Sequence, residues 1–176
     1  KVLAINLVLL SFIYAINIAK AKNINLNMVF VPASEKGDEN DYITLIKILE
    51  KLTGFSIKPI KVTDYNAAVE AMRAGRVQIA WYGGKTYIQA AKLAHAEAFA
   101  AGIRKGEKDA TYFTYFVVRS DSRLKVLNDV RGKILSMNNI GSTSGDLIPQ
   151  VELSKIGLFT RNKKHFKKVF YAGSHD

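Results

Sequence analysis

The chain has 176 residues, 48% of them hydrophobic, and a formal net charge of +11. This length and apolar content suffice for a hydrophobic core in one or two domains and exclude a chain that is disordered by composition. There is no cysteine, which excludes disulfides, thiolate metal sites, cysteine nucleophiles and the acylation site of a bacterial lipoprotein.

The first segment of the chain has the pattern of a secretory signal peptide. Residues 2–18 are nearly all apolar, and the small-x-small sequence Ala-Lys-Ala follows at 19–21. The apolar run is shorter than the roughly 20 residues that a membrane-spanning helix prefers. We therefore predict an exported protein that is cleaved after about Ala21, and the alternatives are an uncleaved membrane anchor or a buried helix.

Residues 22–108 are predicted to alternate between strands and helices. Strands are expected at 27–31, 56–62, 78–82 and 99–103, and helices at 42–52, 64–74 and 86–93. Asp64 suits a helix N-cap, and Gly54 and Gly75 stand where helices should end. Such alternation is typical of a mostly parallel sheet with helices on its faces.

Residues 109–176 are expected to form a second unit. A polar stretch at 106–110 and a long aromatic and β-branched strand at 112–119 mark a candidate hinge or domain crossing. Beyond it we predict a strand at 134–137, a helix that reaches about residue 156, a last helix around 163–168 and a strand at 169–171. The domain prediction is thus 1–21, 22–108 and 109–176.

Residues 140–145 (Ile-Gly-Ser-Thr-Ser-Gly) follow a predicted strand and open a predicted helix. Unpaired backbone N–H groups, the hydroxyls of Ser142, Thr143 and Ser144, and the positive end of the helix would converge there on an oxyanion. The alternative is structural, because serine and threonine are ordinary N-caps and glycine relieves tight turns. The spacing fits neither a nucleotide P-loop nor a nucleophile elbow.

Two other side chains are candidates for contact with a ligand. Tyr82 ends a predicted strand, where parallel α/β sheets place their ligands, although strand aromatics are usually part of the core. His175 follows a Gly-Ser pair at the end of the last predicted strand, where an imidazole could donate to an oxyanion. The three histidines have no metal-ligand spacing, so we expect no metal and no cofactor.

The basic residues are spread along the chain, with one denser run at 161–168. No aromatic ladder or recognition motif accompanies them, so we expect no nucleic-acid partner. On an exported protein the charge would favour encounter with anions without forming a site.

With these segments in view, the chain resembles the PhnD-like substrate-binding proteins of ABC transporters for phosphonate, phosphite and phosphate, which are type II periplasmic binding proteins. A turn at 127–133 (Leu-Asn-Asp-Val-Arg-Gly-Lys) also resembles one that many type II binding proteins share. The resemblance covers residues 25–176 and rests on five segments in the family's order: 62–65 (Val-Thr-Asp-Tyr), 79–83 (Ile-Ala-Trp-Tyr-Gly), 112–122, 142–145 (Ser-Thr-Ser-Gly) and 172–176 (Ala-Gly-Ser-His-Asp).

The resemblance implies two α/β lobes that are joined by a hinge and bind a small phosphorus oxyanion in the cleft between them. It also implies a periplasmic location, an ABC-transporter permease of the inner membrane as partner, and no catalysis. The second lobe is expected to be incomplete, because family members are longer. The residues that the resemblance places at the ligand are Tyr65, Tyr112, Ser142, Thr143, Ser144 and His175, with Tyr82 beside them.

Two other functions remain open from the sequence. A ligand-sensing domain of a signalling receptor would keep the same fold. A phosphate-ester hydrolase would need an acid/base pair or metal carboxylates near the serines, and Asp146 is the only acid nearby. Asp146 is better explained as a first-turn residue that the helix dipole stabilises.

Overall fold

The structure is a computed structural model that describes residues 24–32, 39–160 and 165–175, with the backbone alone for 39–41. The first unit is built on a parallel sheet of three strands, β1 (Asn25–Phe30), β2 (Ser56–Ile60) and β3 (Ile79–Trp81), in the order β2-β1-β3. All three carboxyl ends therefore lie at one edge of the sheet.

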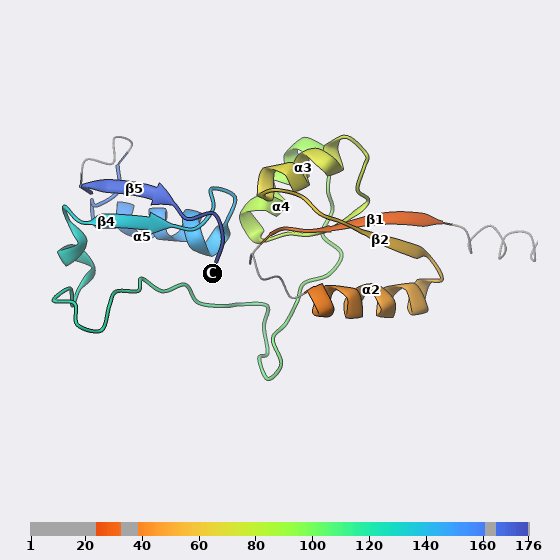
Figure 1. The fold of residues 1–176 in the computed structure, drawn as a ribbon, viewed down its shortest axis with the longest axis horizontal. Coiled ribbons are helices and arrows are strands. Elements are labelled where there is room, and N and C mark those ends of the chain that lie inside the picture. Colours follow the sequence, from red (N-terminus) through yellow and green to blue (C-terminus); the bar gives the residue numbers. More distant parts are fainter. Residues whose placement is uncertain (1–23, 33–38, 161–164, 176) are drawn as a thin grey trace, which may run out of the picture.

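Helices cover both faces of this sheet (Figure 1). Helix α2 (Glu39–Thr53) lies on one face, and α3 (Tyr65–Arg73) and α4 (Gly84–Ala94) lie on the other. Successive residues of β1 point to opposite faces, so Met28 joins the core under α2 while Val29 joins the core under α3. The alternation of strands and helices predicted from the sequence is confirmed here, including the Asp64 cap, whose carboxylate accepts from the Ala67 amide at 2.9 Å.

The second unit is smaller. It contains the 3₁₀ turn η1 (Leu127–Val130), strand β4 (Ile134–Met137), the short π-helical turn η2 (Thr143–Leu147), helix α5 (Ile148–Lys155) and strand β5 (Lys168–Tyr171). Strands β4 and β5 pair in parallel. Leu153 of α5 and Leu158 are fully buried in a core with Met137, Phe159 and Phe166.

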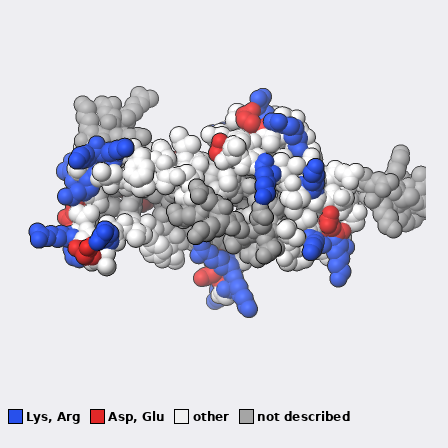
Figure 2. All heavy atoms as spheres, viewed as in Figure 1, with Lys and Arg blue, Asp and Glu red and all other residues white. Residues whose placement is uncertain are grey.

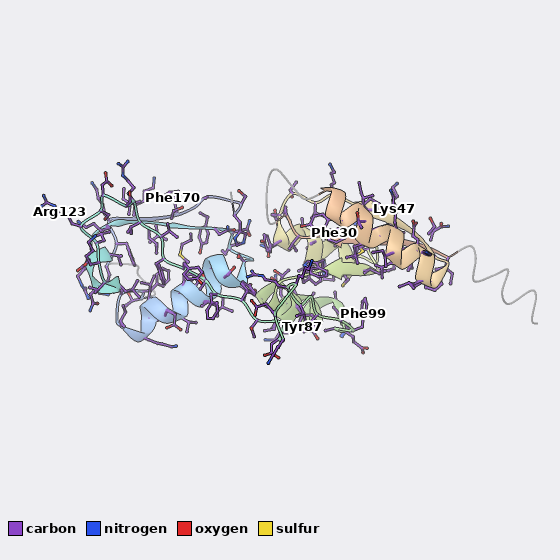
Figure 3. The ribbon with its side chains drawn as sticks, turned by 90° about the horizontal axis from the view of Figure 1, so that it is seen from below. Phe30, Lys47, Tyr87, Phe99, Arg123 and Phe170 are labelled. Atoms are coloured by element: carbon purple, nitrogen blue, oxygen red, sulfur yellow. The ribbon has the colours of Figure 1, made fainter. Side chains whose placement is uncertain are left out.

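The two strands predicted between these units are absent from the structure. Residues 99–103 and 112–119 belong to a long extended connection that runs from α4 to η1 (Figure 1). Phe99, labelled in Figure 3, lies outside the first sheet and is 80% exposed, and Val117 is 86% exposed. Residues with high β-propensity do not form a strand by themselves, because a strand needs a neighbouring backbone to pair with. None of the described residues provides such a partner for these two segments.

The helix predicted around residues 163–168 is also wrong over the part of it that the structure describes. Residues 165–167 form a turn, Lys168 already belongs to β5, and 163–164 lie outside the described residues. The predicted signal peptide, residues 1–21, lies outside them as well. Of the helices in the described ranges, none is long and apolar enough to cross a membrane.

Charge is not concentrated on the face seen in Figure 2. Lys and Arg side chains are scattered over both units, with a few acidic side chains among them.

Leu153→Ala should lower the free energy of unfolding by about 2–5 kcal/mol, because it leaves a cavity in the core of the second unit. Val151 lies on the same helix and is 42% exposed, so Val151→Ala is the matched control and should cost under about 1 kcal/mol. Denaturant unfolding measures both. Equal losses in the two variants would contradict the packing described for α5.

Candidate functional site

The site predicted from the sequence lies where the carboxyl ends of four strands approach each other. Tyr65 begins α3 shortly after β2, Lys85 lies in the first turn of α4 after β3, and His175 follows β5. The segment after β4, residues 140–146, is called here the serine loop. The N-terminal ends of α4 and of the η2–α5 helix meet at the centre of the molecule, so the two units touch through this loop (Figures 1 and 3).

Ser142 makes several of the contacts that hold the loop together. Its side chain is 2% exposed and caps η2, accepting from the Gly145 amide at 3.0 Å. Its Oγ lies 3.2 Å from Nε2 of His175, and it is near enough to Tyr65 to lower the pKa of that hydroxyl. Three of the residues predicted from different segments of the sequence are therefore brought together around Ser142.

Close packing fixes the position of the loop. A Cβ atom added to Gly141 would stand 2.3 Å from the Cβ of Tyr65, and one added to Gly145 would stand 2.1 Å from the Cβ of Asn138. Neither position tolerates a side chain, since real Cβ atoms do not approach other atoms so closely. The two glycines let the backbone lie directly against Tyr65 on one side and Asn138 on the other.

The first turn of η2 presents backbone donors. No described residue accepts a hydrogen bond from the N–H of Thr143 or of Ser144, whereas the amides on either side, Ser142 and Gly145, are both engaged. The turn continues directly into α5, so the positive end of this helix faces the same point. These amides are available to an acceptor that carries negative charge.

The hydroxyl groups nearby are neutral donors. Burial raises the pKa of Tyr65, the hydrogen bond with Ser142 lowers it in part, and the neighbouring Tyr112 and Tyr42 raise it further. The Tyr65 hydroxyl is therefore protonated at neutral pH. Thr143 Oγ1 accepts from the Lys85 amide at 2.8 Å, which leaves its own hydrogen to donate.

Tyr112 and Ser144 stand at the outer side of this group. Tyr112 is 49% exposed and lies close enough to Tyr65 to affect its pKa, and the guanidinium of Arg104 lies 5.4 Å from the centre of the Tyr112 ring. Thr114, on the same extended connection, donates to the Ser144 carbonyl at 2.8 Å. The connection thus passes beside the serine loop although it forms no strand.

Tyr82 is not brought to the serine loop. Its hydroxyl donates to the Ala68 carbonyl at 3.0 Å, and its ring packs against the core beneath α3. Burial raises its pKa to about 12. In this structure Tyr82 has the core role that the sequence left open as the alternative.

Several contacts of the loop were not predicted. Lys85 and Thr86 of α4 both bind it, and Asp146 is the partner of Lys85. Asn138 and Asn139 tie the loop to the segment after β5, donating to the carbonyls of Ser174 and Gly173. A Gly-Gly pair before Lys85 was the one available signal, since it permits close approach at the start of a helix.

Among the described residues, no group of three His, Cys, Asp or Glu side chains could hold a metal ion. The arrangement gathers neutral donors, namely two amides, the serine and threonine hydroxyls and a tyrosine hydroxyl, with the His175 imidazole beside Ser142. It is suited to holding an oxyanion.

Comparison with known proteins agrees with this geometry. A family model for the periplasmic substrate-binding protein of a phosphonate ABC transporter matches residues 28–176. Among curated proteins, the phosphate-import protein PhnD of Mycolicibacterium smegmatis is 30% identical over 158 residues, which are 86% of this chain and 49% of that protein.

Solved structures are similar as well. The binding-protein component of an ABC phosphonate transporter from Pseudomonas aeruginosa has a TM-score of 0.75 at 25% identity, over 86% of this chain and 51% of that one. PhnD1 from Prochlorococcus marinus, in complex with methylphosphonate, has a TM-score of 0.59 at 21% identity, over 86% of this chain and 57% of that one. The chain thus spans about half the length of these relatives.

Tyr82→Phe should lower the free energy of unfolding by about 0.5–1.5 kcal/mol, because it removes the hydrogen bond to Ala68. Its pKa is raised above the unfolded value near 10, so this stabilisation is complete below about pH 10 and is lost as the pH rises towards 12. The variant should therefore lose less stability than the wild type over that range. Tyr115→Phe, at an exposed position, is the control, and identical pH profiles for Tyr82→Phe and the wild type would contradict this role.

Proposed function

This chain belongs to the family of periplasmic substrate-binding proteins of phosphonate ABC transporters, and from that premise we propose that it captures a small phosphorus oxyanion for uptake. The ligand class is a tetrahedral phosphonate, phosphite or phosphate. The partner is an ABC-transporter permease in the inner membrane, and the mature protein begins after about Ala21.

The observation that carries this proposal is the pair of amides at Thr143 and Ser144, for which no described residue is an acceptor, with the Ser142, Thr143 and Tyr65 hydroxyls around them. A tetrahedral oxyanion presents several acceptor oxygens to separate donors at once. Neutral donors replace its hydration shell without a fixed countercharge, so the ligand is held and can still be released.

The proposal assigns residues 22–108 and 109–176 to two lobes, with the ligand bound between them. Tyr65 would come from the first lobe, and Ser142, Thr143, Ser144 and His175 from the second. Tyr112 would reach the site from the connection between the lobes. Closure around the ligand would then produce the form that the permease recognises.

The relatives' ligands support this class. The mycobacterial relative is named as a phosphate-import protein, and the Prochlorococcus structure holds methylphosphonate. All of these are small phosphorus oxyanions, so what they share is the tetrahedral group that amides at a helix end can bind.

The hydrolase alternative is disfavoured by the position of Asp146. Its carboxylate is fully buried and paired with Lys85, so it is unavailable as a base to activate water. The family consists of binding proteins, and no residue is assigned a catalytic role. A signalling receptor domain would use the same site, and the permease partner is what distinguishes the two.

Isothermal titration of the protein encoded by the complete gene, with phosphate, phosphite, methylphosphonate and 2-aminoethylphosphonate, tests the proposal. We expect tight binding of at least one of them. Ser142→Ala should weaken it by about 10- to 100-fold, since a hydrogen bond to a charged group is worth roughly 1.5–3 kcal/mol.

Ser154→Ala is the matched control. Its hydroxyl donates to the Phe159 carbonyl at 3.0 Å in the same unit, so the variant should keep its affinity even where it loses stability. A folded protein that binds none of the four ligands would overturn the proposed function, and unchanged affinity in Ser142→Ala would overturn the site.

A further inference from the structure

Lys85 contacts the serine loop at three positions along its length. Its ammonium group donates to the Ile140 carbonyl before the loop turns and to the Asp146 carboxylate after it. Its backbone N–H donates to Thr143 Oγ1 between these two points, at 2.8 Å. One residue of α4 therefore holds the beginning, the middle and the end of the loop.

The contact also completes helix α4. Its N-cap residue is Gly83, which has no side chain to accept from the first-turn amides. Thr143 supplies that acceptor from the other unit, and a Cβ atom on Gly83 would stand only 3.2 Å from its Oγ1. Thr86, which is fully buried, adds a hydrogen bond of 2.8 Å to the Gly141 carbonyl.

Hydrogen bonds within the second unit fix the carboxylate of Asp146, which pairs with Lys85. Its side chain is fully buried, and Oδ1 accepts from Gln150 at 2.5 Å and from the Tyr171 hydroxyl at 2.6 Å, while Oδ2 faces Lys85. The Lys85 side chain is 28% exposed. The carboxylate is thus fixed by its own unit, and the ammonium arrives from the other.

We propose that Lys85 is a positioning residue for oxyanion binding, which holds the serine loop in its binding geometry by pairing with Asp146 across the two units. The inference rests on the proposed function. Because Asp146 neutralises the ammonium and Ile140 takes another of its hydrogens, Lys85 acts through the loop and not as the ligand's own countercharge.

The pair also links loop geometry to closure of the units. Separating the units would break the ion pair of Lys85 with Asp146 and the hydrogen bonds from Lys85 to Ile140 and Thr143. The contact therefore favours the arrangement in which α4 and the serine loop are together. Loss of the ammonium should shorten the lifetime of the bound state more than it slows ligand entry, because the loop amides would no longer be held in place.

Lys85→Met tests this in the protein encoded by the complete gene, with methylphosphonate as the probe. We expect affinity to fall at least tenfold, with most of the change in the dissociation rate measured by stopped-flow displacement. Lys155→Met is the matched control, because Lys155 forms an exposed ion pair with Glu152 in the second unit, and its binding kinetics should equal those of the wild type.

The double variant Lys85→Met/Asp146→Asn separates positioning from stability. It removes both charges, and asparagine keeps the shape of the carboxylate. The unfolding midpoint of the double variant should therefore be higher than that of Lys85→Met, while methylphosphonate should still dissociate as fast as it does from Lys85→Met. Wild-type dissociation kinetics in either variant would overturn the positioning role and leave the proposed function intact.

The stability measurements remain decisive if no ligand binds. A wild-type protein that binds no oxyanion would overturn both the proposed function and the positioning role that rests on it. The unfolding midpoints of Lys85→Met, Asp146→Asn and the double variant would then still test the ion pair itself, and additive effects would show that the two residues do not interact.

Discussion

The arrangement of the site depends on the first turn of η2, where the helix begins with two amides that have no acceptor among the described residues. Ser142 caps the turn, and Gly141 and Gly145 let its backbone lie against Tyr65 and Asn138. This packing holds the amides at the edge where the strands of both units end. An oxyanion placed there would satisfy groups that the chain leaves open.

Most of the fold could be predicted from the sequence, because it follows from local patterns. Apolar residues at helical spacing, caps such as Asp64 and short β-rich runs between them specify the elements of each unit, and the structure contains them. The strands expected at 99–103 and 112–119 do not form, because pairing depends on a partner that composition cannot reveal. The strand propensity of a residue depends more on the side chains and strands around it than on its own backbone.

The site could be predicted in part. Ser142, Tyr65 and His175 belong to separate segments, and the structure brings them together, because all of them follow the carboxyl ends of parallel strands. Tyr82 satisfied the same rule and yet turns its hydroxyl to Ala68, since side-chain direction is set by packing. For Lys85 the preceding Gly-Gly pair is the only local signal, because its partners lie more than fifty residues away in the chain.

Amide hydrogen exchange at residues 141–147, measured with and without saturating methylphosphonate, would show whether the two amides bind the ligand. We expect the Thr143 and Ser144 amides to exchange rapidly in the free protein and to become protected when the ligand binds, while the Gly145 amide, already bonded to Ser142, changes less. Binding of methylphosphonate without any added protection at Thr143 and Ser144 would contradict this expectation.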